Sequence, residues 1–187
     1  MSRSRPALLD CGRRPGTCFP WAVPSFDDLL KANRRYRAEF HDSGVEGTAA
    51  KGLAVLTCID SRIDPLAMLG LRPGDAKILR NAGARVTEDS LRSLVLAANL
   101  LGVNRVCVVQ HTDCAMVGRR NEDIAAAIGR RRGVDASAWD FLVSTDQVET
   151  LHRDIALISS CPLLPAGFQV GGFIFDVHSG ELVPAPS

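Results

Sequence analysis

The sequence has no long hydrophobic segment. None of its 187 residues belongs to a run approaching the ~18 apolar residues that a membrane-spanning helix needs. The first 24 residues, which are rich in arginine and proline, also lack the apolar run of about 7–15 residues found in a secretory signal. We therefore expect a cytoplasmic protein with no membrane partner.

An excess of charge is absent too. The formal net charge is +1, which gives no reason to expect nucleic acid or another polyanion as a partner. There is no internal repeat, and a chain of this length usually forms one domain. We expect an irregular, proline-rich arm over residues 1–24 and a single α/β domain over residues 25–187.

The cysteines form no single cluster. In a cytoplasmic chain of this size, cysteine together with histidine more often indicates a metal site or catalysis than a disulfide framework. Cys107 lies inside an apolar strand pattern and Cys161 precedes Pro162 at an expected helix end, so we interpret both as inert. For Cys11 and Cys18 a second metal site is the less favoured interpretation. Six cysteines are present in all: Cys11, Cys18, Cys58, Cys107, Cys114 and Cys161.

Short apolar runs alternate with amphipathic stretches along the chain. The run 53–58 is continuously apolar and partly β-branched, which is typical of a strand buried on both faces. Alternation of such strands with helices predicts an α/β fold: a predominantly parallel sheet with helices on both faces, plus an N-terminal helical arm. We expect strands at 53–58, 76–80, 105–110 and 172–177, and helices at 25–41, 87–101, 114–130 and 137–160.

Candidate metal ligands lie at two strand ends. Cys58 ends one predicted strand, and His111 directly follows another. Because sites in open α/β sheets form at the carboxyl ends of strands, these two residues are expected to meet. Cys114, three residues after His111, can face the same point. Two thiolates and one imidazole suit Zn²⁺, and three protein ligands leave a fourth position for water, as in catalytic zinc sites.

Two charged residues follow Cys58 closely. Asp60 and Arg62 stand two residues apart at the mouth of the predicted strand, where carboxylate and guanidinium can pair bidentately. An ordinary surface ion pair is the simpler alternative. Their position beside a candidate metal ligand favours a functional pair.

These motifs resemble those of the β-carbonic anhydrases. The segment from Cys58 to Arg62 resembles the family's C-x-D-S-R motif, and the segment from His111 to Cys114 resembles its H-x-x-C motif. The resemblance continues, in order, over roughly residues 50–183. It includes 74–77, 80–83, 88–94, Leu101-Gly102 and the closing strand 172–177. The compact length is similar to the small, archaeal-like branch of the family.

The resemblance implies a homodimer, often doubled to a tetramer, whose N-terminal helical arm packs on the partner subunit. It also places three residues beside the substrate. Lys77 matches a position that approaches the partner's active site, and Gly83 belongs to the matched segment 80–83. Ala115 stands where the family usually has glycine, so the pocket beside the metal could be narrower here.

The expected reaction is reversible hydration of CO₂ to bicarbonate and a proton by zinc-bound hydroxide. Cys58, His111 and Cys114 would bind the metal. Asp60 would accept the hydrogen bond of the hydroxide, and Arg62 would keep Asp60 ionised and oriented. Asp60 is itself a possible fourth ligand, so we expect higher activity at alkaline pH.

Three alternatives stay open on the same residues. Relatives on this scaffold hydrolyse carbonyl sulfide or carbon disulfide, which are linear, apolar molecules like CO₂. A non-catalytic zinc protein, with Asp60 as a permanent fourth ligand, is a second alternative, against which the presence of Arg62 argues. A cysteine-nucleophile enzyme using Cys58 and Arg62 is disfavoured because phosphatase loops need a longer, glycine-rich segment between the two residues.

Overall fold

A computed structural model describes residues 26–41 and 44–186 of the chain. Contacts divide the chain into two units, Met1–Ser43 and Gly44–Ser187. In the first unit the described residues form one helix, α1 (Asp27–Glu39), with Phe26 at the N-cap position, in agreement with the helix expected over 25–41. Ser25, the predicted boundary at residue 24, Cys11 and Cys18 lie outside the described residues.

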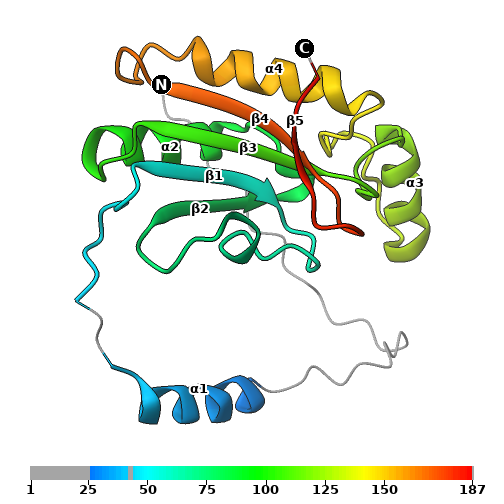
Figure 1. Ribbon diagram of the computed structural model, residues 1–187. Coiled ribbons are helices and arrows are strands. Elements are labelled where there is room, and N and C mark those ends of the chain that lie inside the picture. The colour runs from blue at the N-terminus through cyan, green and yellow to red at the C-terminus, as the bar shows by residue number, and fades with distance from the viewer. Residues whose placement is uncertain (1–25, 42–43, 187) are drawn as a thin grey trace, which may run out of the picture. The chain divides into compact units, whose positions relative to one another are not determined.

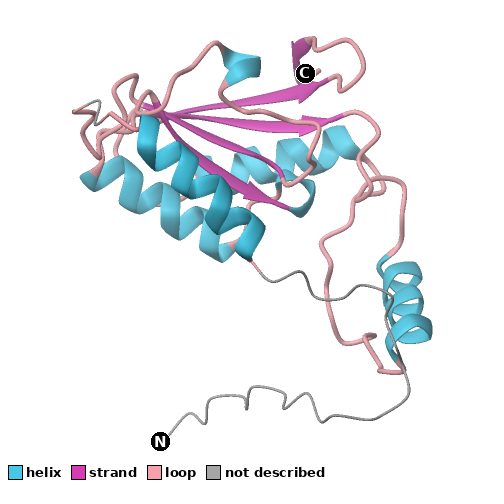
Figure 2. Cartoon of the chain, turned by 90° about the horizontal axis from the view of Figure 1, so that it is seen from below, coloured by secondary structure: helices cyan, strands magenta, loops and turns pink. Residues whose placement is uncertain are grey.

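The described part of the second unit is built on a five-stranded sheet with the strand order β2-β1-β3-β4-β5. The first four strands are parallel and β5 is antiparallel to β4, which confirms the predicted α/β class with a mainly parallel sheet (Figure 1). Figure 2 shows the strands fanning out with the twist usual for a sheet. The strands are β1 (Leu53–Cys58), β2 (Ala76–Asn81), β3 (Arg105–His111), β4 (Gln169–Phe175) and β5 (Leu182–Pro184).

One face of the sheet is covered by two helices, α2 (Glu88–Leu100) and α4 (Gln147–Ser159). Helix α2 begins with a capping box between Thr87 and Ser90, as the sequence predicts from Thr87. Both helices contribute fully buried side chains to the same core as alternate residues of β1 and β3. These core residues include Leu94, Leu151 and Ile158 from the helices, and Ala54, Leu56, Val106 and Val108 from the strands.

The other face differs from the prediction of helices on both sides. Among the described residues, the connection between β1 and β2 packs there, with the short 3₁₀ turn η1 (Ala67–Leu69). This connection joins neighbouring parallel strands without an α-helix, so its apolar side chains cover the sheet directly. They are Ile63, Met68, Leu69 and Leu71, packed with Leu53, Val55 and Val109.

The two helices after β3 are shorter than predicted. Helix α3 spans Asn121–Arg132 instead of 114–130, because Asp113 and Gly118 have positive φ angles of 54° and 71° that interrupt a helix. Helix α4 begins ten residues later than predicted, after the N-cap residue Asp146, whose side chain accepts a hydrogen bond from the Glu149 N–H. Within residues 26–41 and 44–186, no helix is long and apolar enough to cross a membrane.

Candidate metal centre

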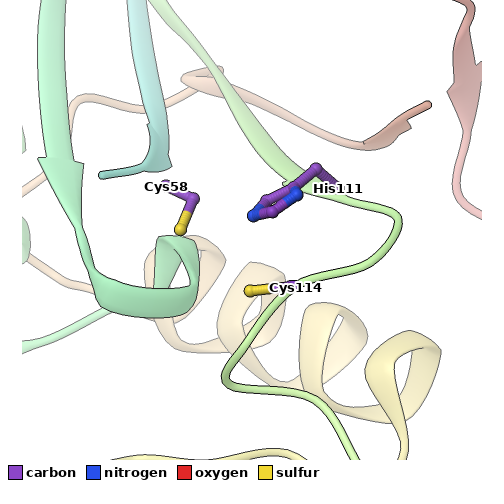
Figure 3. Close-up of side chains that lie close together, drawn as sticks. All are labelled: Cys58, His111 and Cys114. Atoms are coloured by element: carbon purple, nitrogen blue, oxygen red, sulfur yellow. The ribbon is translucent and has the colours of Figure 1, made fainter. Parts of the chain in front are cut away.

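Three potential metal ligands converge at the carboxyl edge of the sheet. β1 ends at Cys58 and the adjacent parallel strand β3 ends at His111, while Cys114 lies in the turn that follows β3. Their side chains point toward one another (Figure 3), and the two sulfurs and a ring nitrogen all lie within 4.8 Å of one another. The predicted juxtaposition of Cys58 and His111, with 52 residues between them in the sequence, therefore follows from the pairing of β1 with β3, and the group could hold a metal ion.

The imidazole of His111 is oriented for ligation. Its Nδ1 lies 2.8 Å from the Thr112 carbonyl oxygen, which can only accept, so Nδ1 carries the proton and Nε2 carries the lone pair. Nε2 is buried and has no hydrogen-bond partner among the described residues. A buried polar atom without a partner is costly, and a cation held between this nitrogen and the two sulfurs would satisfy it.

Cys58 and Cys114 shift each other's pKa in opposite directions. The hydrogen bond from Cys114 lowers the pKa of Cys58, assisted by His111 and by the Gly83 N–H, which lies 3.3 Å from the sulfur. The thiolate of Cys58 correspondingly raises the pKa of Cys114. Burial lowers the pKa of His111 and is the largest single effect, but the neighbouring Cys58, the Thr112 carbonyl and Asp60 together outweigh it and raise this pKa. The site is thus built to stabilise positive charge beside Cys58.

A carboxylate lies at the same point. Asp60 Oδ2 is 3.9 Å from His111 Nε2 and 2.8 Å from a terminal nitrogen of Arg62. Asp60 Oδ1 accepts hydrogen bonds from the backbone N–H and the Nε of Arg62, at 2.9 and 3.0 Å. These bonds from Arg62 hold the pKa of Asp60 well below its usual range, so Asp60 is an ionised, oriented acceptor.

Arg62 also reaches the segment that carries His111 and Cys114. It donates to the Asp113 carboxylate at 2.7 Å and to the Asp113 carbonyl at 3.0 Å. Asp113, which the sequence analysis did not single out, adopts a left-handed backbone conformation. Arg62 thereby ties the loop after β1 to the turn after β3.

Arg80, in β2, is a second residue whose role sequence reasoning missed. Its guanidinium donates to three backbone carbonyls, those of Cys58, Asp60 and Ile63, at 2.8, 2.7 and 3.1 Å. These bonds fix the loop that follows Cys58. The only sequence signal for Arg80 was its place in the matched segment 80–83. Its partners are backbone carbonyls, which every residue has, so the sequence does not reveal them.

The remaining residues discussed from the sequence lie in different surroundings. The Lys77 ammonium donates to the Gly47 carbonyl, Gly83 is buried beside Cys58, and Ala115 is exposed next to Cys114. Cys107 is partly buried in β3, where burial raises its pKa, as suits the inert role predicted for it. Cys161 lies just after α4.

Known proteins resemble this chain over most of its length. The family model described as carbonic anhydrase matches residues 53–134. A β-carbonic anhydrase 1 from Mycobacterium tuberculosis is 33% identical over 156 residues, which cover 83% of this chain and 94% of that protein. The crystal structure of a carbonic anhydrase from Streptococcus mutans superposes with a TM-score of 0.81 at 38% identity. This match covers 88% of this chain and 99% of the other.

A relative with a different name is somewhat less similar. A carbon disulfide hydrolase from Acidithiobacillus thiooxidans is 29% identical over 153 residues, covering 71% of this chain and 76% of that protein. The extent of the first matches, on a chain whose two cysteines and histidine meet at the edge of a parallel sheet, decides the assignment: this protein belongs to the β-carbonic anhydrase family.

Proposed function

We propose that this protein is a zinc-dependent carbonic anhydrase, a lyase that reversibly hydrates CO₂ to bicarbonate and a proton. Its family supports this reaction. The observation that carries the proposal is the buried Nε2 of His111, which has no hydrogen-bond partner in the described part of the chain. It is grouped with two sulfurs and lies 3.9 Å from an ionised carboxylate oxygen of Asp60.

Cys58, His111 and Cys114 would hold the metal. Two sulfurs and an imidazole nitrogen are ligands that Zn²⁺ favours, and three protein ligands are typical of catalytic zinc. Bound there, Zn²⁺ acts as a Lewis acid that makes water nucleophilic near neutral pH. A binding site for a cation also fits the lowered pKa of Cys58, because that thiol is ready to ionise.

Asp60 would orient the attacking water. As an ionised carboxylate it can only accept a hydrogen bond, so it would accept one from the attacking oxygen and direct that oxygen's lone pair toward the carbon of CO₂. Both Asp60 oxygens are engaged by Arg62, which fixes the carboxylate and keeps it charged. Of the water's two protons, one would be released to buffer and the one directed at Asp60 would stay in the bicarbonate product, which departs when another water enters.

The Asp60–Arg62 pair also supports catalysis over a purely structural metal. A structural site would use Asp60 as a fourth ligand, whereas here Asp60 Oδ2 is 2.8 Å from Arg62. Gly83 and Ala115 adjoin the two cysteine ligands, and we propose that they border the path of the substrate, with Lys77 as a weaker candidate at the subunit boundary.

Assembly and location are further parts of the proposal. α1 carries large apolar side chains that one helix cannot bury by itself, and this supports docking of the arm on a partner subunit in a dimer or tetramer. These side chains are Phe26, Leu29, Leu30, Tyr36 and Phe40. Sedimentation equilibrium would measure the assembly. A cytoplasmic location stays a prediction from the sequence.

Parallel assays with two substrates test the reaction. The zinc-loaded protein is assayed for CO₂ hydration by stopped flow and for carbonyl sulfide hydrolysis by sulfide release. We expect kcat/KM for CO₂ to exceed that for carbonyl sulfide by at least about 100-fold. The groups that orient the attacking water act in both reactions, so the shape of the pocket must discriminate between the two substrates. A large excess for carbonyl sulfide would overturn the proposal in favour of the sulfur-substrate hydrolases among its relatives.

A further inference from the structure

A carboxylate is buried on the apolar face of α4. Asp154 has no solvent exposure and shares a helix face with the core residues Leu151 and Ile158. Burying a carboxylate is costly unless it is paired and hydrogen-bonded. A charged residue at an otherwise apolar helix position is the sequence signal that points to Asp154, and its partners indicate why it is there.

Both carboxylate oxygens of Asp154 accept hydrogen bonds from the same segment, Arg85-Val86. Oδ2 accepts hydrogen bonds from Arg85 Nε at 2.7 Å and from the Val86 N–H at 3.2 Å, and Oδ1 accepts one from a terminal nitrogen of Arg85 at 3.2 Å. The remaining terminal nitrogen of Arg85 donates to the Leu142 carbonyl at 2.7 Å. Arg85, only 9% exposed, is therefore held at fixed points on α4 and on the loop that precedes it.

The held segment is the tight turn that follows β2. The Asn81 carboxamide closes this turn by donating to the Arg85 carbonyl and accepting from the Arg85 N–H, both at 2.7 Å. Inside it, Gly83 and Ala84 have positive φ angles of 78° and 55°. Glycine adopts such an angle readily, but at Ala84 it is strained and needs support from the surrounding structure. This backbone conformation presents the Gly83 N–H to Cys58 Sγ at 3.3 Å.

The same helix face reaches the other candidate ligand. Gln147, seven residues before Asp154 and so about two helical turns away, lies on nearly the same side of α4. Its Nε2 donates to the His111 carbonyl at 2.8 Å. Helix α4 thus contacts the backbone at His111 directly. It is linked to the Cys58 sulfur only indirectly, through Arg85 and the turn that contains Gly83.

We infer that Asp154 and Arg85 are positioning residues that hold the turn 81–86 so that the Gly83 N–H donates to the Cys58 sulfur. This inference rests on the zinc site proposed above. The N–H stabilises negative charge on that sulfur, and the clamp keeps the sulfur at its distance from His111 and Cys114. Loss of the clamp lets the turn relax, which weakens metal binding without removing any ligand.

Asp154→Asn tests the inference with little change in volume. The amide nitrogen of Asn presents hydrogen atoms to a guanidinium and a backbone N–H that also only donate, so the clamp opens. We expect Zn²⁺ affinity, measured by competition with a chelator, to fall by about 10-fold or more. Amide hydrogen exchange of Gly83, followed by NMR in the zinc-loaded protein, should become faster. Recovery of both by Asp154→Glu would support contact through the carboxylate.

Ile158→Ala is the matched control, because it also weakens the core contacts of α4 but its side chain makes no hydrogen bond to the turn. We expect it to change Zn²⁺ affinity by less than about twofold. If Asp154→Asn does not fold, the double variant Arg85→Met/Asp154→Leu removes both charges at similar volume, a replacement that often preserves folding. It should show the same loss of affinity.

The outcomes separate this inference from the proposed function. If the unaltered protein binds no Zn²⁺, the proposed zinc site is wrong and the inference fails with it. If it binds Zn²⁺ and the clamp variants match Ile158→Ala in both affinity and Gly83 exchange, only the positioning role is overturned.

Discussion

At the scale of single residues, Arg62 is the side chain that joins the two segments carrying the candidate metal ligands. It pairs with Asp60 after β1 and with Asp113 after β3. The side chain is 39% exposed, so its ion pairs contribute little to the free energy of folding. Its main contribution is to hold the two segments in a fixed geometry. A planar guanidinium can serve both carboxylates and the Asp113 carbonyl at once, whereas an ammonium cannot.

Arg62→Lys should therefore keep the charge and lose the orientation of Asp60. We expect kcat/KM for CO₂ hydration to fall by about 10- to 100-fold with zinc content unchanged, because no ligand is altered. Stopped-flow assays and metal analysis of the purified variant measure both. Arg92→Lys, in an exposed pair with Asp89 on α2, is the control. Full activity in Arg62→Lys would remove Arg62 from the proposed role.

Asp176, just after β4, supports the His111 segment from a distance. Its Oδ1 accepts the Thr112 hydroxyl at 3.4 Å and the backbone N–H groups of His178 and Ser179 at 2.8 and 3.2 Å. The His178 N–H, followed by that of Ser179, lowers the pKa of Asp176. The folded protein therefore favours the charged carboxylate.

Asp176→Asn should show the resulting pH dependence of stability. The unfolded pKa is about 3.9, and the folded pKa lies lower, so the stabilisation is present above about pH 4 and is lost as pH falls through the folded value. Urea unfolding of wild type and variant at about pH 6 and about pH 3 should give a smaller difference at the lower pH. A difference that grows on acidification would contradict this.

At the scale of elements, the strands near the site were the most predictable part. β1 and β3 are apolar runs that read as buried strands, and β1 is buried at every position. The three-residue strand β5 carries too short a pattern to be recognised. The late starts of α3 and α4 depend on left-handed residues such as Asp113 and Leu142, whose φ angles are set by tertiary contacts rather than by residue type.

The turn η2 (Ala82–Ala84) offers a test of local geometry, because Gly83 and Gly180 have nearly equal φ angles of 78° and 79°. A Cβ at Gly83 would lie 3.3 Å from Met116 Cβ, whereas at Gly180 it would meet no described atom within 4 Å. Gly180→Ala should cost about 1–2 kcal/mol for the φ angle alone. Gly83→Ala should cost at least about 1 kcal/mol more through crowding.

Urea unfolding of the two metal-free variants measures these costs. Only Gly83→Ala should also lower Zn²⁺ affinity, since only that turn donates a hydrogen bond to Cys58. Equal losses of stability, with zinc binding intact in both, would show that the turn is not packed as described.

At the scale of the whole molecule, the candidate site draws on segments far apart in the chain. Cys58, His111, Cys114, Asp60 and Arg62 could be named from their chemistry and their places at strand ends. Arg80 could not, because it acts through backbone carbonyls that any sequence supplies. Asp154 stands out as a charged residue on an apolar helix face, but nothing in the sequence identifies Arg85, 69 residues away, as its partner. Their importance depends on which loops the fold brings together.

Because its ligands come from two strands and a turn, the metal should stabilise the whole second unit. Free Zn²⁺ at about 1,000 times its Kd adds about 4 kcal/mol to the free energy of unfolding. Calorimetry with zinc and with a chelator should then show Tm values about 10 °C apart. The gap should narrow at acidic pH, where protons compete for the sulfurs and the imidazole. Equal Tm values would indicate that the three residues do not bind zinc.

The most direct measurement is zinc content together with CO₂ hydration for wild type, Cys114→Ala and Cys161→Ala. Cys161, just after α4, serves as the control for loss of a cysteine away from the grouped ligands. We predict about one zinc ion per chain and full activity in wild type and Cys161→Ala, with near-complete loss of both in Cys114→Ala. Retention of zinc and activity by Cys114→Ala would contradict the account.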